Sequence, residues 1–344
     1  MSTITATTTV ITDYVGETLD ERILSSKKPV IIKGLVNHWK FVEEGRKSDS
    51  SAINYLKSHY NGRPSVACIG PPEIKGRFFY DAQGTELNFD TQQMKIDEVL
   101  NLIQDGFTEQ NPTSYYIASN VIDTHFPNFR GENDINIPRP FANSPLEDIR
   151  TSIWIGNRTI ACCHYDASDN LACCVVGKRR FTLFPPDQIA NLYPGPLSPT
   201  PGGQALSMVD FANPDFAKYP KFAEAIKHGQ IADLEAGDAL YLPSMWWHQV
   251  EGLRPFNVLI NYWWSNSAKY MGPAMNVLYH AMLSLRDKPE HEKLAWKHIF
   301  DYYIFGDAQQ AGEHLPEQAR GYLGEMDLAK SKMLRAMLLN KLNR

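Results

Sequence analysis

The sequence lacks the features of a membrane-anchored or secreted protein. Among its 344 residues, no stretch approaches the roughly 20 consecutive apolar residues that a membrane-spanning helix needs. The strongest apolar run is the short one from Leu171 to Val176. The first residues, Met1 to Ala6, do not show the basic start and following apolar segment of a secretory signal. We therefore expect a soluble, cytoplasmic protein.

An excess of positive charge is also missing. The chain has 34 Lys and Arg against 39 Asp and Glu, which gives a formal net charge of -5. Binding to DNA or to an anionic membrane normally uses a broad basic surface. The charge balance disfavours a nucleic-acid partner and favours a protein, peptide or amino-acid substrate.

Cysteine is scarce, and its spacing suits neither a disulfide framework nor a zinc site. The count of five is odd, and four of them form the adjacent pairs Cys162-Cys163 and Cys173-Cys174. Such usage is normal in a reducing compartment. A zinc site that joins these cysteines to His164 is an alternative, but the C-x-x-C spacing is absent. We interpret the four residues as small, buried core side chains.

The pattern of apolar residues divides the chain into three segments. Residues 1–113 mix helical and strand-like runs, as in an α/β flank, whereas residues 114–266 alternate aromatic and β-branched runs with Pro and Gly turns, which is typical of a β barrel or sandwich. Residues 267–344 show helical spacing throughout. The expected elements are helices at 17–24, 51–59, 96–103 and 215–228, strands at 29–34, 115–117, 152–155, 171–176, 181–184, 239–242 and 258–264, and a loop at 194–203.

The C-terminal helices have wide apolar faces. One of them contains Val277, Leu278 and Met282, and the next contains Leu294 and Ile299. Two interpretations fit this pattern equally well. The helices either form a subunit interface or pack on the outside of the β domain.

Three residues have the types and spacing of a metal site. His164 and Asp166 are two residues apart, so on a strand their side chains project from the same face. His248 lies 82 residues beyond Asp166, behind a proline and a pair of tryptophans. Two histidines and one carboxylate on one face of an octahedron are the ligands of non-haem Fe(II) oxygenases.

The motifs around these residues resemble a known family. Gly237, Pro243 and His248 keep the spacing of the second cupin motif, and the stretch from His164 to Gly177 keeps that of the first. Four further matches make the chain more closely similar to the cupin-like JmjC oxygenases, a family that includes the asparaginyl hydroxylase of hypoxia-inducible factor. They are Trp154-Ile155-Gly156, Gly177 to Pro186, Asn191 to Pro194 and Trp246-Trp247-His248. The resemblance extends over roughly residues 29 to 265.

The resemblance implies a mainly β fold. The expected architecture is a double-stranded β-helix, which is a cupin or jelly-roll barrel, with flanking N-terminal helices and a C-terminal helical dimerisation segment. The resembling hydroxylases dimerise through C-terminal helices, so we expect a homodimer through residues 274 to 342.

The resemblance also implies the cofactors and their binding residues. Fe(II) is expected on His164, Asp166 and His248, with 2-oxoglutarate chelating the metal and O2 taking the last position. Where the family holds the distal carboxylate of 2-oxoglutarate with a lysine, a tyrosine and a threonine, this sequence has Arg179, Tyr116 and Ala161. Asn170 and Asn261 match asparagines near the metal and cosubstrate, and Trp263 matches an aromatic residue that lines the site.

The leading interpretation is an Fe(II)- and 2-oxoglutarate-dependent dioxygenase that hydroxylates an amino-acid side chain of a protein, peptide or small molecule. A metal-containing cupin that serves as a binding module without oxygenase turnover is the alternative, and Ala161 and Arg179 favour it. A third interpretation uses the metal as a Lewis acid, but such sites do not need the open facial ligand set. The loops at 194–203 and 120–143 are expected to select the substrate.

Overall fold

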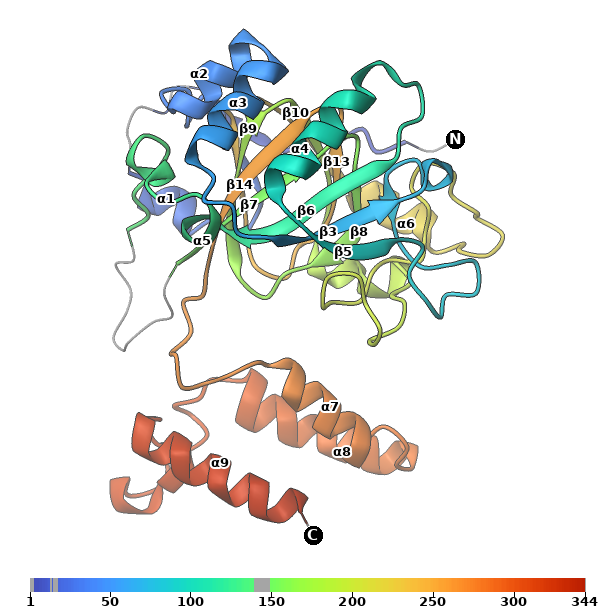
Figure 1. The fold of residues 1–344 in the computed structure, drawn as a ribbon. Coiled ribbons are helices and arrows are strands. Elements are labelled where there is room, and N and C mark those ends of the chain that lie inside the picture. The colour runs from blue at the N-terminus through green and yellow to red at the C-terminus, as the bar shows by residue number, and fades with distance from the viewer. Residues whose placement is uncertain (1–2, 13, 15–17, 139–148, 344) are drawn as a thin grey trace. The chain divides into compact units, whose positions relative to one another are not determined.

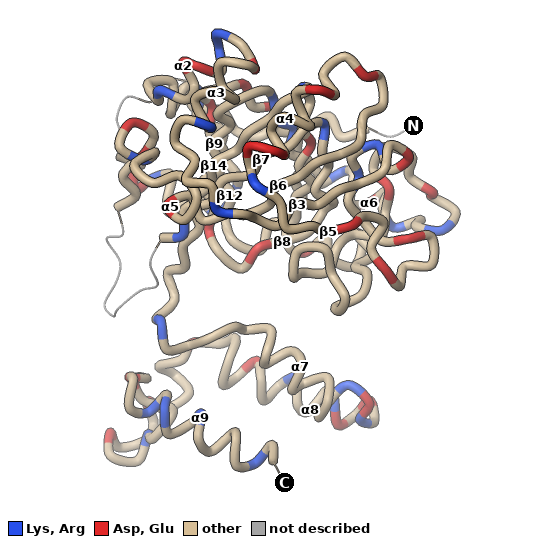
Figure 2. The backbone as a smooth tube through the Cα atoms, in the orientation of Figure 1, with Lys and Arg blue, Asp and Glu red and all other residues tan. Residues whose placement is uncertain are grey.

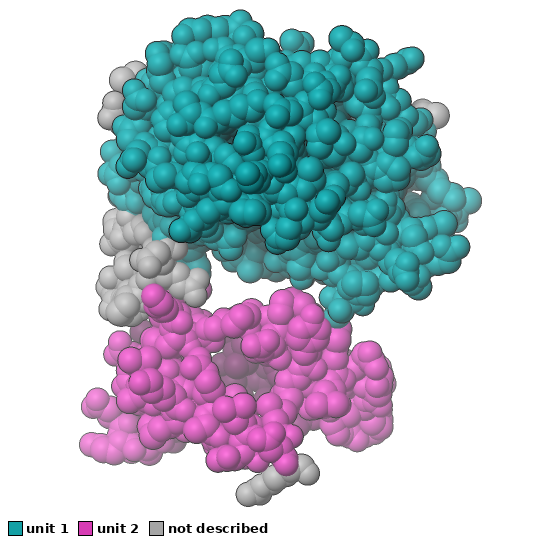
Figure 3. All heavy atoms as spheres, viewed as in Figure 1, with its two compact units in different colours: residues 1–140, 148–265 teal, residues 141–147, 266–344 magenta. Residues whose placement is uncertain are grey.

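The computed structural model describes residues 3–12, 14, 18–138 and 149–343 (Figure 1). These residues divide into two compact units, one within residues 3–265 and the other within residues 266–344 (Figure 3). Basic and acidic residues are interspersed along both units (Figure 2). Among the helices formed by the described residues, none is long and apolar enough to cross a membrane.

The first unit is mainly β, as predicted, and contains two sheets. The larger sheet has nine strands in the order β1-β2-β12-β9-β14-β7-β6-β3-β5. Their bounds in that order are Thr9–Ile11, Val30–Ile32, Ala239–Leu242, Asp169–Val176, Asn257–Trp264, Arg150–Gly156, Ser114–Val121, Ser65–Gly70 and Asp90–Met94. Apart from the parallel pair β1 and β2, neighbouring strands are antiparallel.

The smaller sheet has five strands in the order β11-β10-β13-β8-β4. Their bounds in that order are Gln230–Glu235, Lys178–Phe184, Trp247–Gly252, Ile160–Tyr165 and Arg77–Phe78. No strand of the described residues is shared between the two sheets. The structure thus shows two separate sheets, and the closed barrel stays a prediction.

One hydrophobic cluster joins the two sheets. Cys174, Leu240 and Leu259 contribute from the larger sheet, and Phe181 and Leu183 contribute from the smaller one. Side chains alternate between the two faces of a strand, so each sheet places every second residue in this shared core.

The cysteine pairs follow the same alternation. Cys174 lies in the core between the sheets, whereas its neighbour Cys173 packs on the opposite face of β9. All four cysteines of these adjacent pairs are buried and form no disulfide, which confirms their interpretation as core residues. Burial raises the pKa of the Cys162 thiol to about 12, so it stays protonated at neutral pH.

Helices cover the other face of the larger sheet. Helices α2, α3 and α4 pack through Phe41, Ile53 and Leu100 against Ile117 and Val175 of the sheet (Figure 1). Their bounds are α2 Lys40–Lys47, α3 Asp49–His59 and α4 Ile96–Asp105, with short helices α1 Glu21–Leu24, α5 Ile122–His125 and α6 Phe222–His228 elsewhere in the unit. The helix predicted for residues 215–228 is wrong over its first half. Pro220 disfavours a helical conformation at Tyr219, so α6 begins only at Phe222.

The second unit consists of helices, as the apolar spacing predicts. They are α7 Met275–Ser284, α8 Glu290–Phe300, which continues into a π-helical turn at Asp301–Phe305, and α9 Leu328–Leu342. Most of their large apolar side chains are exposed, including Val277, Leu283, Leu294, Ile304, Phe305, Leu328, Met333, Leu339 and Leu342.

Candidate metal centre

Two neighbouring strands and the turn after one of them bring the predicted ligands together. His164 on β8 and His248 on β13 stand opposite each other in the antiparallel register, with ring centroids 4.4 Å apart. Asp166 follows β8 directly, and its Oδ2 lies 3.6 Å from His248 Nε2. One potential ligand atom from each of the three side chains lies within 4.8 Å of the other two. This is close enough for a single metal ion to touch all three.

The backbone orients both imidazoles for ligation. His164 Nδ1 lies 2.8 Å from the Cys162 carbonyl oxygen, and His248 Nδ1 lies 3.0 Å from that of Trp246. A carbonyl only accepts hydrogen bonds, so each Nδ1 carries the proton and each Nε2 presents a lone pair.

His248 is held neutral by its surroundings. Burial lowers the pKa of His248 to about 4, the neighbouring imidazole of His164 adds to this shift, and the carboxylate of Asp166 opposes it. The imidazole therefore carries no charge at neutral pH, which is the form that binds metals.

Packing fixes the segment that carries His248. Trp247 is buried against Tyr165 with ring centroids 4.9 Å apart. Trp246 joins the core between the sheets and donates a hydrogen bond from Nε1 to the Lys27 carbonyl at 3.2 Å. The paired tryptophans thus anchor the start of β13 on both sides.

Arg179 is a buried cation with unused donors. It is 1% exposed, and its Nε and Nη2 make no hydrogen bond among the described residues. Tyr116 lies beside it: burial raises the pKa of Tyr116 to about 12, and the charge of Arg179 and a hydrogen bond with it oppose the rise. The structure therefore brings together two residues that the sequence predicted for one carboxylate. Buried donors without partners are costly, and they mark a place where an acceptor ligand fits.

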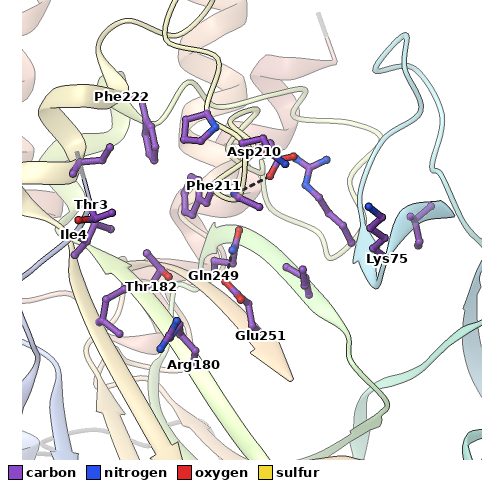
Figure 4. A pocket seen from close by; sticks show the side chains of 18 of the residues that line it. Thr3, Ile4, Lys75, Arg180, Thr182, Asp210, Phe211, Phe222, Gln249 and Glu251 are labelled. Carbon is purple, nitrogen blue, oxygen red and sulfur yellow. Dashed lines mark hydrogen bonds between the residues drawn. The ribbon is translucent and has the colours of Figure 1, made fainter. Parts of the chain in front are cut away.

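The neighbours of Arg179 on β10 face away from it. Lys178 pairs with Glu235, and Arg180 pairs with Asp233 at 2.8 Å. Arg180 also lines a separate cavity of about 1060 Å³ on the outer face of the smaller sheet (Figure 4). Of these three cations, Arg179 alone is buried.

A chain of hydrogen bonds orients the two predicted asparagines. Trp154 Nε1 donates to Asn261 Oδ1 at 2.8 Å, and Asn261 Nδ2 donates to Asn170 Oδ1 at 3.2 Å. The indole N–H can only donate, so the oxygen of Asn261 must face Trp154. The amide nitrogen of Asn261 then faces the oxygen of Asn170. The sequence singled out Trp154 as a motif residue only, because its partners are remote in the chain.

A cavity of about 520 Å³ opens onto His164 and Asp166. Aromatic rings line it in an unbroken series of contacts, with centroid distances of 5.0 to 5.9 Å; the series runs Phe89, Phe78, Tyr116, Trp154 and Trp263. Ala161 and Cys162 also line the cavity. The sequence predicted Tyr116 and Trp263 here but missed Phe78 and Phe89, whose positions depend on contacts between distant strands.

The loop predicted at 194–203 supplies Pro201 and Gly202 to this cavity. Of the other predicted substrate-selecting segment, 120–143, no described residue lines the cavity, and residues 139–143 lie outside the described residues.

The donor set fits Fe(II) and a small dicarboxylate. Two neutral imidazoles and a carboxylate suit a divalent first-row metal, and three ligands leave further positions open toward the cavity. The unused donors of Arg179 suit a carboxylate.

Comparison with known proteins gives matches over most of the first unit. A family model described as a cupin-like domain matches residues 16–270. JmjC domain-containing protein D of Dictyostelium discoideum is 30% identical over 238 residues, which cover 65% of this chain and 49% of that protein. Lysine-specific demethylase JMJ31 of Arabidopsis thaliana is 37% identical over 119 residues, which cover 34% of this chain and 21% of that protein. tRNA wybutosine-synthesizing protein 5 of Gallus gallus is 40% identical over 103 residues, which cover 30% of this chain and 29% of that protein. The chain spans half or less of the length of these relatives.

Proposed function

The chain belongs to the cupin-like JmjC domain family, and from this premise we propose that it is an Fe(II)- and 2-oxoglutarate-dependent dioxygenase that hydroxylates an amino-acid side chain. The observation that carries the proposal is the meeting of His164, Asp166 and His248 beside a cavity and a buried cation with unused donors. We also propose residues 114–266 as the catalytic segment.

His164, Asp166 and His248 would hold the metal. Both imidazoles present Nε2, and the carboxylate of Asp166 offsets part of the metal charge. When bound, the ferrous ion supplies O2 activation, coupled to oxidation of the cosubstrate.

Arg179 and Tyr116 would hold the distal carboxylate of 2-oxoglutarate. A guanidinium binds a carboxylate through two parallel hydrogen bonds, which satisfies donors that are otherwise buried without partners. Ala161 supplies no hydroxyl, whereas the guanidinium of Arg179 offers five N–H donors against the three of a lysine ammonium. Asn170 and Asn261, held by Trp154, would fix the orientation of the cosubstrate, and Trp263 would line its site.

The substrate that we propose is a side chain of a protein, a peptide or a free amino acid. The net charge of -5 and the mixed distribution of charge support this class over nucleic acid (Figure 2). The free cysteines support a cytoplasmic location.

We further propose that the protein is a homodimer through its C-terminal helices. Exposed apolar side chains such as Leu283 and Phe305, which are 79% and 75% exposed, support this proposal. Soluble monomers rarely expose large apolar surfaces without a partner for them.

Substitution His164→Ala tests the proposed function, with His228→Ala as its matched control. His228 is an exposed histidine that pairs with Glu224 on α6. We expect His164→Ala to lose stoichiometric Fe(II) and the conversion of 2-oxoglutarate to succinate, and His228→Ala to keep both. Full turnover in His164→Ala would contradict the assignment. A wild-type protein that binds iron but neither binds nor consumes 2-oxoglutarate would favour the binding-module alternative.

A further inference from the structure

Few of the described residues that line the cavity beside the candidate metal centre carry a charge. They are Asp166 and Arg150, which lie in the lining together with the imidazole of His164. Arg150 is an exposed residue at the start of β7, so its guanidinium stands at the mouth of the cavity. The salt bridges of the described residues include Arg22, Arg130, Arg180 and Arg286, each with an aspartate, but not Arg150.

The neighbours of Arg150 hold its guanidinium in one place. Nε donates to Ser152 Oγ at 3.2 Å, and Nη2 lies 3.0 Å from the Ser119 carbonyl oxygen and 3.3 Å from Ser119 Oγ. Ser119 has a φ of 51° and lies in the irregular part of β6, between Ile117 and Asn120. Arg150 Cζ also lies 5.8 Å from the ring centroid of Trp263. These contacts orient the cation before any ligand arrives.

Two donors at this place make no hydrogen bond among the described residues. One is Nη1 of Arg150, because the side-chain hydrogen bonds that Arg150 makes within the described residues come from Nε and Nη2. The other is the buried Nε1 of Trp263, which lines the same cavity. A positive charge beside a further unused N–H suits a ligand that is anionic and accepts hydrogen bonds.

Charge balance favours the same ligand class, and this step rests on the proposed function. The positive charges of a ferrous ion and Arg179 would be balanced by Asp166 and the two carboxylates of 2-oxoglutarate. Among the described residues that line the cavity, Arg150 would then remain as the one charge without an opposite partner, beside the aromatic walls.

We propose that Arg150 is a specificity-determining residue, and that the hydroxylated substrate is an acidic peptide whose Asp or Glu carboxylate binds Arg150 while the target side chain enters the aromatic cavity. A carboxylate suits the partly engaged guanidinium, because Nη1 offers two N–H groups to it. Binding to a nucleic acid uses many cations along its row of phosphates, whereas the described lining of this cavity offers the single guanidinium of Arg150, which suits one carboxylate of a peptide.

The experiment uses two pools of synthetic random peptides with the full-length, Fe(II)-loaded protein and 2-oxoglutarate. The first pool contains Asp and Glu, and the second has Asn and Gln in their place. Mass spectrometry measures the gain of one oxygen atom. We expect the wild type to modify the acidic pool at least about tenfold more than the amide pool, as the loss of a charge-assisted contact predicts.

Variants separate a role in binding the substrate from a role in folding. Arg150→Gln should abolish the preference, Arg150→Lys should retain part of it, and the control Arg180→Gln should leave it unchanged, because Arg180 lies on the outer face of its sheet. Calorimetry then measures binding of the peptide that the wild type modifies most, with zinc in place of iron and 2-oxoglutarate bound. We expect this peptide to bind Arg150→Gln at least about tenfold more weakly than the wild type. Arg150→Glu should prefer a pool with Lys in place of Asp and Glu.

Two results would overturn the role of Arg150 and leave the proposed function standing. One is equal modification of both pools by a wild type that binds 2-oxoglutarate, and the other is modification of neither pool by such a protein. Failure of the wild type to bind 2-oxoglutarate at all would instead overturn the proposed function and this inference with it.

Discussion

At the scale of single residues, the contrast between Arg179 and Arg180 shows how a strand sorts two identical side chains. Arg180 lies on the outer face, 44% exposed, and pairs with Asp233. Arg179 lies on the inner face, almost fully buried, with two nitrogens unused. An uncompensated buried charge destabilises a fold, so its presence is better explained by ligand binding than by stability.

Substitution Arg179→Met should stabilise the ligand-free protein. Methionine fills a similar volume and removes the unused donors, so we expect a gain of roughly 1–3 kcal/mol in the free energy of unfolding, measured by urea titration without metal. The control Arg180→Met loses only an exposed ion pair and should cost less than about 1 kcal/mol. A larger loss of stability in Arg179→Met than in Arg180→Met would contradict this interpretation of the buried cation.

At the scale of secondary structure, strand alternation carried most of what the sequence could predict. It placed His164 and Asp166 on one face and put the members of each cysteine pair on opposite faces, because both inferences depend only on neighbouring residues. Contacts between distant strands could not be predicted this way. Trp154 and Asn261 are 107 residues apart, and nothing near either of them in the sequence names the other.

Helix prediction failed where local patterns were ambiguous. The helix α2, Lys40–Lys47, was missed because only Phe41 and Val42 of its eight residues are apolar and buried. The helix expected at 215–228 was too long, since proline interrupts its first half. A mostly polar helix that packs on a core through only two side chains has the same sequence pattern as a charged loop, so a single sequence does not distinguish them.

The turn before β10 requires glycine at position 177. Gly177 has a φ of 81°, and a Cβ there would lie 2.5 Å from both Asn257 Oδ1 and the Phe256 carbonyl oxygen. We expect Gly177→Ala to lower the free energy of unfolding by about 1–3 kcal/mol in urea titration. We also expect it to weaken 2-oxoglutarate binding, because it would shift the strand that carries Arg179.

Gly131→Ala is the matched control for this change. Its φ is ordinary, and a Cβ at that position would meet no atom within 4 Å. We expect its stability to stay within about 1 kcal/mol of the wild type. Equal losses of stability in the two variants would show that the left-handed backbone at Gly177 does not require glycine.

At the scale of the whole molecule, the two units differ in how they bury apolar side chains. The first unit has a core between its sheets and a second cluster under its helices. The second unit leaves side chains such as Leu283, Ile304 and Phe305 exposed. Helical spacing predicted these elements, but a single sequence cannot specify what covers their faces. A second copy would bury them, as in an obligate dimer interface that resembles a divided core.

Light scattering coupled to size-exclusion chromatography tests this proposal. We expect a dimer at micromolar concentration, and a monomer when Leu283→Glu and Phe305→Glu are combined, because burying two carboxylates in an apolar interface is unfavourable. Ile189→Glu changes an exposed apolar residue of the first unit and should remain dimeric. A monomeric wild type would refute the dimer.

We propose that this chain binds 2-oxoglutarate on iron with Arg179 as the anchor of its distal carboxylate, and an anaerobic titration tests this binding most directly. Chelation of Fe(II) by a keto acid produces a visible charge-transfer band. We expect the band in the wild type and in Arg180→Met, and an affinity for 2-oxoglutarate at least about tenfold lower in Arg179→Met. A wild-type protein that binds iron and develops no band would contradict 2-oxoglutarate binding and favour a metal-containing binding module.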